Sequence, residues 1–361
     1  MFVVGAAMFY TGLAQAIGEK VVHIFGTGEN SLMLGLMLVG TALSSVLSNT
    51  GTCACLMPVA LGICAASKNT ASRQLLPMAY ACGWGGIITL VGTPPNIIGS
   101  GALTAAGLPG FSFFEFAWIG IPLSVAGILY MLLIGKYMLP KAELDADQEI
   151  EQEIEATTHD KKKQVISGVI LLACVTVMAL NLKFISLEMT AIIGALVCVL
   201  TGCLTEKQAY SSIDWVTIFL FAGMMPVSTA MDKTGAGKLI ANLAVGLMGG
   251  EPTPLIVTIV LFSISCFLTQ FMSNTASAAL LCPIGIAIAK QLNADPKAVV
   301  MAIAVAASCA FATPVGTPPC TLVLGPGGYK FMDYVKCGTG LVLVCFVVSL
   351  IVIPMVWPFF H

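Results

Sequence analysis

Apolar positions run along this chain in long uninterrupted segments. Three segments carry no charged residue: Leu32–Ser67 has 36 residues, Gln74–Phe114 has 41 and Pro252–Ala289 has 38. About 20 apolar residues are enough for a helix to cross a bilayer. The segments lack the polar–apolar alternation of transmembrane strands, which argues against a β-barrel. The pattern therefore predicts an all-α polytopic membrane protein.

The composition points to the same class of protein. Of the 361 residues, 58% are hydrophobic and 9% are charged, whereas soluble domains carry about 25% charged residues. Nothing in the net charge of −2 or in the single arginine, Arg73, suggests a nucleic-acid partner. The thirteen cysteines form no CxxC pair, and we expect small buried apolar side chains at these positions.

Two short motifs occur twice. Ser48-Asn49-Thr50 returns as Ser273-Asn274-Thr275, and Val91–Pro95 returns as Val315–Pro319. The first serine precedes the threonine of the second motif by 45 residues in one copy and by 44 in the other. Membrane transporters are often built from internal repeats of this kind. The sequence therefore predicts two structural repeats.

The segments between the copies indicate that the repeats are inverted. Five crossings are expected between the two Ser-Asn-Thr motifs, over 74–114, 116–139, 164–182, 186–204 and 212–231. An odd number of crossings turns the second copy upside down. With this topology one side carries eleven Lys and Arg residues and the other five. The positive-inside rule then places the linker 140–163 in the cytoplasm and the C-terminus outside.

Each repeat contains one helical hairpin and one broken helix. In the run 32–67, about 16 residues precede the polar tripeptide, enough for a helix of about 24 Å. The hydrocarbon core is about 30 Å thick. We therefore expect re-entrant hairpins over 32–67 and 252–289. The Gly-Thr-Pro-Pro sequences should unwind the transmembrane helices 74–114 and 298–325, because proline removes a backbone donor.

The hairpin tips carry neutral polar chemistry. Ser, Asn and Thr cap helix N-termini, and a helix N-terminus binds anions through its N–H groups. Ser44 and Thr269, four residues before the tip serines, can supply oxygens to a cation such as Na⁺. None of the four elements contains a charged residue or histidine, although proton-coupled carriers usually need a titratable group in the membrane. The pattern favours Na⁺ coupling or exchange.

These paired motifs resemble the divalent anion/Na⁺ symporter family, which carries di- and tricarboxylates or sulfate. The resemblance extends over essentially the whole chain. It implies a homodimer whose protomers have a scaffold and a moving transport domain, working as an elevator. The second break departs from the first in one respect, since Cys320 stands where the first has Asn96.

The resemblance also implies a division of the chain. Its parts are a scaffold remnant over 1–31, the first half of the transport domain over 32–139, the linker 140–163, the second scaffold over 164–250 and the second transport half over 251–361. About 110 residues separate Lys163 from Ser273, but only 47 precede Ser48. We therefore expect an N-terminally truncated member that lacks two to three helices.

Site residues follow from the resemblance position by position. One Na⁺ site is expected at Ser44, Ser48, Asn49 and Gly92, and a second at Thr269, Asn274 and Gly316. The anion site is expected between them, lined by Asn49, Thr50, Thr93, Asn274, Thr275, Thr317 and Pro318.

The expected function is Na⁺-coupled uptake of a divalent anion, such as a C4-dicarboxylate, across the plasma or inner membrane. Na⁺ is the only cofactor expected. A Na⁺-independent carboxylate exchanger would use the same fold and stays open as an alternative. A membrane-embedded enzyme or respiratory subunit is disfavoured, because the apolar segments offer no acid, base or cofactor ligand. The chain also has no HExxH, GxSxG or Walker motif.

Overall fold

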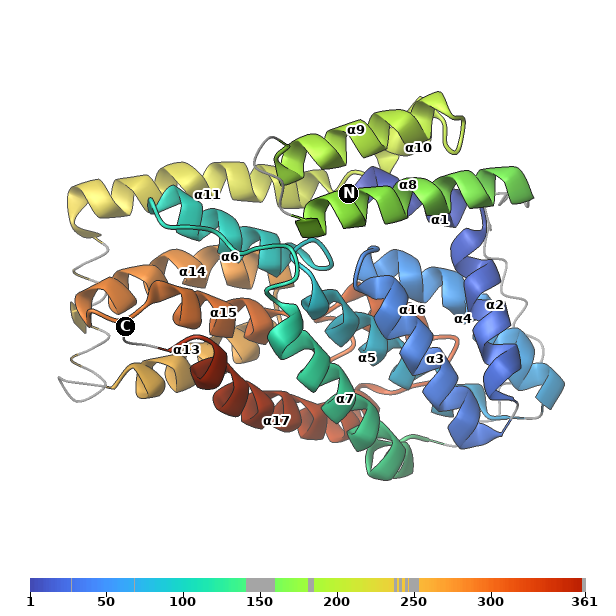
Figure 1. Ribbon diagram of the computed structural model, residues 1–361. Helices are drawn as coiled ribbons and strands as arrows, with labels where there is room; N and C mark the ends of the chain where they lie inside the picture. Colours follow the sequence, from blue (N-terminus) through green and yellow to red (C-terminus); the bar gives the residue numbers. More distant parts are fainter. Residues whose placement is uncertain are drawn as a thin grey trace. The chain divides into compact units, whose positions relative to one another are not determined.

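The computed structural model describes residues 1–26, 28–67, 69–140, 160–180, 185–236, 239, 242–243, 246 and 253–358. Every regular element among these residues is a helix, so the predicted all-α class is confirmed (Figure 1). The helices form two compact units. Unit 1 comprises Met1–Gly86, Ile128–Asp214 and Pro318–Asp333, and unit 2 comprises Ile87–Gly127, Trp215–Thr317 and Tyr334–His361.

Unit 1 contains the first hairpin and the helices around it. Its described α-helices are α1 (Phe2–Tyr10), α2 (Leu13–Phe25), α3 (Glu29–Ser44), α4 (Asn49–Ser67), α5 (Leu75–Gly85), α8 (Lys161–Leu180), α9 (Leu187–Leu200), α10 (Glu206–Ser211) and α16 (Pro318–Leu324). Two short 3-10 helices, η1 (Ala71–Arg73) and η3 (Gly135–Tyr137), lie in the same unit.

Unit 2 contains the second hairpin. Its described helices are η2 (Gly86–Ile88, from its second residue), α6 (Pro94–Ala105), α11 (Trp215–Thr234), α13 (Pro254–Leu268), α14 (Asn274–Gln291) and α15 (Pro296–Ala307). Two long helices are shared by the units: α7 (Ala117–Leu133) enters unit 1 at Ile128, and α17 (Phe331–Val356) enters unit 2 at Tyr334.

The two repeats exchange their last short helices. The helix after the second break, α16, packs against α4 and α5 of the first repeat. The helix after the first break, α6, packs against α14 and α15 of the second repeat, as Figure 1 shows. Each unit therefore combines a hairpin, the helix that follows it, and a short helix from the other copy. The breaks make this possible, because each ends one helix before the chain enters the other unit.

The helices that lead into the breaks form the centre of each unit. Every residue of α5 is buried, including Tyr80 and Trp84, and the same holds for Ala298–Ala307 of α15. A helix that is apolar on all sides either fills a core or spans a membrane. Trp84 meets its polar requirement by donating an indole hydrogen bond of 2.8 Å to Thr41 on α3.

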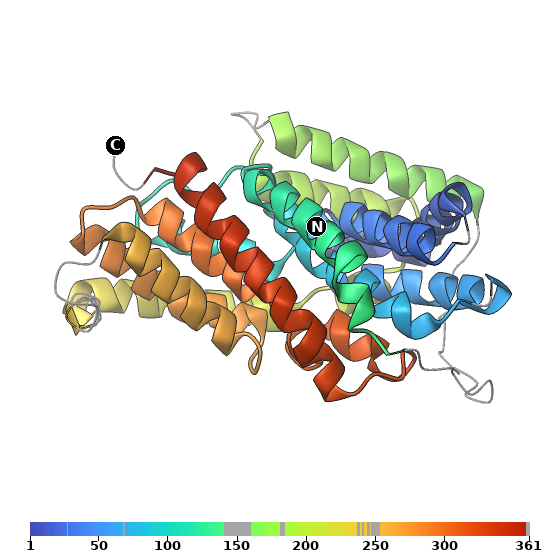
Figure 2. The same ribbon diagram turned by 90° about the horizontal axis from the view of Figure 1, so that it is seen from below.

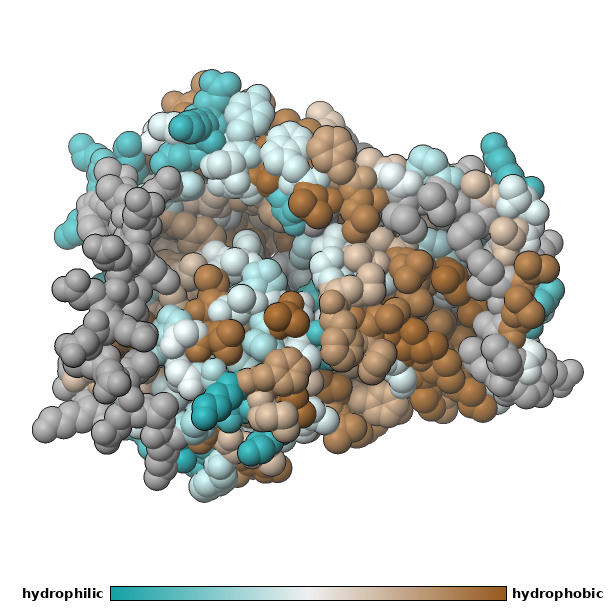
Figure 3. All heavy atoms as spheres, turned by 180° about the vertical axis from the view of Figure 1, so that it is seen from behind, coloured by the Kyte–Doolittle hydropathy of each residue, from teal (hydrophilic) through white to brown (hydrophobic). Residues whose placement is uncertain are grey.

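The outer helices present apolar side chains at their surface. Three described segments are long and apolar enough to cross a membrane: Ala117–Tyr137, Lys161–Leu180 and Phe331–Val356. The last contains all of α17, the long red helix of Figure 2. Its 26 residues correspond to about 39 Å of helix. Exposed leucine, isoleucine, valine and phenylalanine occur on α7, α8, α9, α13 and α17, and apolar surface covers much of the face in Figure 3. Such a surface requires lipid as its solvent.

Several expected boundaries differ from the observed helices. Most of the linker, residues 141–159, lies outside the described residues, and its basic end forms the first turn of α8. The first hairpin begins at Glu29, three residues before the charge-free run. In the second repeat α15 ends at Ala307, so nine residues, 308–316, separate the end of this helix from Thr317-Pro318. Hydrogen bonds from a neighbouring side chain explain this early end, as described below.

Candidate functional site: two polar hairpin tips

The first hairpin turns at a small group of oxygen atoms. Helix α3 ends at Ser44, and α4 begins at Asn49. Ser44 Oγ lies 2.6 Å from Asn49 Oδ1 and 2.7 Å from the carbonyl oxygen of Cys82, in the last turn of α5. We call these three atoms the first oxygen triad. Three separate chain segments thus contribute one oxygen each.

The second hairpin has an equivalent group. Helix α13 ends at Leu268, with Thr269 as its C-cap, and α14 begins at Asn274. Thr269 Oγ1 lies 2.8 Å from Asn274 Oδ1 and 2.6 Å from the carbonyl oxygen of Ala307, the last residue of α15. These atoms form the second oxygen triad. The hydroxyl residue precedes the carbonyl residue by 38 positions in both triads, so the structure repeats the arrangement as well as the motif.

The triads have the chemistry of a cation site. A hydroxyl has a single proton, which it can give to only one of the two acceptors beside it. The second acceptor then faces the lone pairs of the hydroxyl, and a cation would stabilise this contact. Each triad also lies where two helices end, α3 and α5 in unit 1 and α13 and α15 in unit 2. Helix C-termini carry partial negative charge and coordinate Na⁺ in transporters with broken helices.

Two glycines leave room for these groups. A Cβ placed on Gly86 would overlap the side-chain amide of Asn49. A Cβ on Gly316 would come within 3.1 Å of the Thr269 carbonyl oxygen and 2.9 Å of Ala310 Cβ. Both contacts are tighter than ordinary side-chain packing permits. The structure thus brings Thr269, Asn274 and Gly316 together in unit 2.

The residues of the first expected cation site are distributed differently. Ser44 and Asn49 are in contact in unit 1, while Ser48 is exposed and accepts a 3.4 Å hydrogen bond from the Gly51 amide. Gly92 belongs to unit 2, where it is buried and its N–H donates to the Thr89 carbonyl. The glycine that contacts Asn49 is Gly86. It lies outside the repeated motifs, so the sequence did not predict it as a site residue.

The residues expected to bind the anion lie near helix starts. Thr50 and Thr275 are the second residues of α4 and α14, and both are half-buried. Thr93 is the buried N-cap of α6. Thr317 is buried and directly precedes Pro318, the first residue of α16, which is exposed. Asn49, Thr50 and Pro318 belong to unit 1, and the other four belong to unit 2.

One buried residue was missed by the sequence reasoning. Gln270, only 7% exposed, follows Thr269 directly. Its amide nitrogen donates 2.9 Å hydrogen bonds to the carbonyl oxygens of Cys266 and Cys309, and its amide oxygen accepts one of 3.0 Å from the Ala312 N–H. The Thr313 hydroxyl donates to the Gln270 carbonyl at 2.6 Å. Gln270 therefore fixes the unwound segment 308–317, which gives up helical hydrogen bonds for these contacts.

The first unwound segment is held by a different residue. The Asn96 amide donates a 2.8 Å hydrogen bond to the Thr89 carbonyl oxygen. Cys320, the counterpart of Asn96 in the repeat, is a buried residue of α16 in unit 1. Gln270 thus supplies in the second repeat the kind of support that Asn96 gives in the first. The sequence did contain a signal for Gln270, because a glutamine next to a polar tip is unusual in a run of 38 charge-free residues.

Relatives of this chain are transporters. An uncharacterized transporter of Haemophilus influenzae is 34% identical, with 99% of this chain and 79% of the relative covered. The uncharacterized transporter YfbS of Escherichia coli is 25% identical over 99% of this chain and 90% of its own length. A sodium-dependent dicarboxylate transporter, SdcS, of Staphylococcus saprophyticus is 24% identical over 99% of this chain and 75% of its own length.

Two solved structures share the fold. The YdaH transporter of Alcanivorax borkumensis superimposes with a TM-score of 0.65 at 15% identity, covering 98% of this chain and 84% of that one. MtrF of Neisseria gonorrhoeae, from a class of antimetabolite efflux pumps, gives a TM-score of 0.64 at 13% identity, with 97% and 80% covered. The model of the citrate transporter family, CitMHS, matches residues 1–278 and 177–360. This chain is therefore a membrane transporter, not an enzyme, and belongs to the citrate transporter family.

Proposed function

We propose that this transporter couples the movement of Na⁺ to the uptake of a divalent anion such as a C4-dicarboxylate. The observation that carries the proposal is the pair of equivalent oxygen triads, Ser44–Asn49–Cys82 and Thr269–Asn274–Ala307. The sodium-dependent dicarboxylate transporters of Staphylococcus species, 24–25% identical to this chain, support the choice of ion and substrate.

Each hairpin tip provides groups for both charges. In this proposal one Na⁺ binds with Ser44, Ser48, Asn49 and Gly92, and a second with Thr269, Asn274 and Gly316. The C-terminal ends of α3 and α13 favour the cation, while the N-terminal ends of α4 and α14 start at the same tips and favour an anion. A neutral tip can thus attract both partners without a fixed charge.

The dianion is proposed to bind amides, hydroxyls and helix N-termini. The residues that take part are Asn49, Thr50, Thr93, Asn274, Thr275, Thr317 and Pro318. Asn side chains and Thr hydroxyls donate hydrogen bonds to carboxylate oxygens. Bound Na⁺ would lower the cost of bringing two negative charges into a site of low dielectric constant. Cation binding should therefore precede anion binding.

The transport cycle is proposed to follow an elevator mechanism in a homodimer of the plasma or inner membrane. The linker 140–163 would face the cytoplasm, and the C-terminus would lie outside. Na⁺ would order the two tips, the anion would then bind, and the loaded site would cross the membrane. The lysine and arginine distribution supports this orientation.

Uptake into proteoliposomes tests the proposal. Purified protein would be reconstituted and labelled succinate supplied with an inward Na⁺ gradient or with K⁺ in its place. We expect uptake only with Na⁺, and loss of uptake in Asn49→Ala and Asn274→Ala. Uptake that needs internal carboxylate but no Na⁺ would instead identify an exchanger. Wild-type rates in both asparagine variants would refute the site.

The substrate class requires a panel of anions. Malate, fumarate, citrate and sulfate would compete with labelled succinate under the same Na⁺ gradient. Inhibition by the dicarboxylates alone is the expected result. Stronger inhibition by citrate or sulfate would assign the same site to another divalent or trivalent anion.

A further inference from the structure

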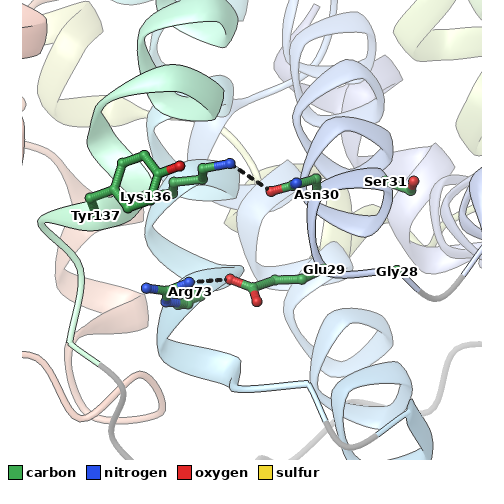
Figure 4. Close-up of a pocket in the computed structure, with 7 residues that line it drawn as sticks. All are labelled: Gly28, Glu29, Asn30, Ser31, Arg73, Lys136 and Tyr137. Atoms are coloured by element: carbon green, nitrogen blue, oxygen red, sulfur yellow. Dashed lines mark hydrogen bonds and ion pairs between the residues drawn. The ribbon is translucent and has the colours of Figure 1, made fainter.

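A pocket at the opposite end of α3 from the first Ser-Asn-Thr motif gathers Arg73, the only arginine of the sequence, and Lys136. It lies in unit 1, has a volume of about 360 Å³ and is lined by Gly28, Glu29, Asn30, Ser31, Arg73, Lys136 and Tyr137. Three segments build it: the first turn of α3, the end of η1, and η3 after α7. Figure 4 shows Arg73 directed at Glu29 and Lys136 directed at Asn30.

The pocket carries more positive than negative charge. Arg73 and Lys136 are both cations, and Glu29 is the only carboxylate among the lining residues. Arg73 pairs with Glu29 at 2.5 Å. The Lys136 ammonium donates a 3.1 Å hydrogen bond to the neutral Asn30 amide, and no carboxylate among the described residues forms an ion pair with it. Within the part of the chain that the structure describes, the pocket lining therefore carries one cation that no carboxylate pairs with.

The donors suit a phosphate group. A guanidinium offers five N–H donors, and among the described residues the Arg73 guanidinium donates a hydrogen bond to Glu29 alone. Lys136, Ser31 and Tyr137 line the same pocket. Gly28 is the N-cap of α3, and it has no side chain that could cap the first turn of this 16-residue helix. Arginine and lysine together are the usual ligands of a phosphate oxygen.

The surroundings favour a lipid as the source of that phosphate. The end of α7 leads directly into the pocket and exposes Leu133, its last residue, and Ile134, the next residue, which are 67% and 50% accessible. Tyr137, in the pocket lining, is 71% exposed, and its ring lies 5.1 Å from the Lys136 ammonium. Tyrosine and tryptophan are enriched at the headgroup level of a membrane. Acyl chains could therefore pack on α7 while the headgroup occupies the pocket.

We propose that this pocket binds the phosphate of an anionic phospholipid, held by Arg73 and Lys136. Basic pockets between transmembrane helices bind anionic headgroups on the cytoplasmic side of membrane proteins. The lipid would join α3, η1 and η3 at one end of unit 1. It occupies no residue of the hairpin tips, so it is independent of the transported anion.

Native mass spectrometry of delipidated protein in an uncharged detergent tests the proposal. Dioleoyl phosphatidylglycerol, dioleoyl phosphatidylcholine and glycerol 3-phosphate would be titrated in separate arms. We expect phosphatidylglycerol to bind more tightly than the other two. Lys136→Gln, which leaves the Arg73–Glu29 pair in place, should weaken phosphatidylglycerol binding about fivefold, the factor that one cation contributes at an anionic surface.

Matched variants decide whether the pocket is responsible. Lys207→Gln alters an exposed lysine of α10 in the same unit, and its binding should stay within twofold of wild type. The double variant Glu29→Gln/Arg73→Gln removes both charges of the ion pair, so it avoids an unpaired carboxylate. This double variant should bind phosphatidylglycerol no more tightly than phosphatidylcholine, and it should keep the helix content of the wild type.

Three outcomes would overturn the proposal. Equal losses in Lys136→Gln and Lys207→Gln would indicate general surface electrostatics. Equal binding of phosphatidylcholine would remove the need for a net negative headgroup. Glycerol 3-phosphate that binds as tightly as the lipid and displaces it would identify a soluble phosphate ester as the ligand.

Discussion

The Thr269 hydroxyl lies 2.8 Å from the side-chain oxygen of Asn274, across the turn that separates α13 from α14. Ser44 and Asn49 stand in the same relationship at 2.6 Å in the first repeat. A hydroxyl and an amide five residues apart are thus held together by two helices that meet at a polar turn. This contact is the part of each oxygen triad that mutation can remove most cleanly.

Thr269→Val should weaken Na⁺ binding at the second triad. Valine keeps the branched shape but replaces the hydroxyl, which leaves the Ala307 carbonyl oxygen without its 2.6 Å neighbour. The substitution also removes one of the oxygens proposed to hold Na⁺, so the half-saturating Na⁺ concentration should rise about tenfold, which corresponds to about 1.4 kcal/mol of binding free energy. The measurement is the Na⁺ dependence of thermal unfolding without substrate.

Two controls accompany this experiment. Thr269→Ser keeps the hydroxyl and should retain most of the Na⁺ response. Thr176→Val changes an exposed threonine of α8 whose hydroxyl bonds the Leu172 carbonyl, and it should not alter the response. An unchanged Na⁺ response in Thr269→Val would exclude the second triad as a cation site.

Gly86→Ala should abolish Na⁺-dependent uptake through a steric effect on Asn49. The added methyl group would overlap the Asn49 amide, and overpacking of this kind costs about 1–3 kcal/mol. Gly62→Ala is the matched control, because a Cβ at that position of α4 meets nothing within 4 Å. That change should raise the melting temperature slightly, since alanine favours a helix. Normal uptake by Gly86→Ala would contradict the close approach.

Gln270→Leu should unfold the segment 308–317 locally. The substitution removes the bonds to Cys266, Cys309 and Ala312, and it takes this partner from the buried Cys309 carbonyl and the part-buried Ala312 N–H. The expected loss of stability is about 2–5 kcal/mol, summed over the lost contacts. Hydrogen exchange measured by mass spectrometry should show faster exchange of peptides covering 308–317.

Gln15→Leu provides the comparison for Gln270. Its amide bonds Glu19 at an exposed position one helical turn away, and such pairs contribute only about 0.2–0.5 kcal/mol. Exchange in 308–317 should match wild type in this variant. Equal exchange in Gln270→Leu would show that other contacts hold the unwound segment.

Glu115 should link the stability of unit 2 to acid pH. Burial by itself would raise the pKa of Glu115, but hydrogen bonds from Lys297, Trp357 and the Ser112 N–H outweigh it and hold the pKa below its ordinary value of 4.5. A depressed carboxyl pKa stabilises the folded state above the unfolded-state pKa, and this stability is lost as pH falls through the folded-state pKa. The contacts joining Glu115 to α15 and to the residue after α17 should therefore be complete above about pH 5.

The test compares thermal unfolding of wild type and Glu115→Gln from pH 3 to pH 7. The difference in melting temperature should be largest at neutral pH and should shrink below about pH 4.5. Glu206→Gln, at an exposed position in the first turn of α10, should give a small difference at all pH values. A difference for Glu115→Gln that grows towards low pH would reverse the assigned sign.

The sequence alone determined the class of fold and the two polar tips. Long charge-free runs must be buried in lipid or in the core of a protein. The recurrence of Ser-Asn-Thr at a fixed spacing marks equivalent turns. Helix propensity and capping then place the start of α4 at Asn49 and of α14 at Asn274. These are local properties, so they can be read from neighbouring residues.

Only the tertiary structure decided which atoms surround the tips. The carbonyl oxygens of Cys82 and Ala307 complete the triads, yet a backbone carbonyl looks the same at every position of a sequence. Gly86 and Gln270 act through helices that meet them in space, and the exchange of α6 and α16 between the repeats depends on where each break releases the chain. Such contacts depend on packing between distant segments, which hydrophobic patterning leaves open because any apolar face can pack against several others.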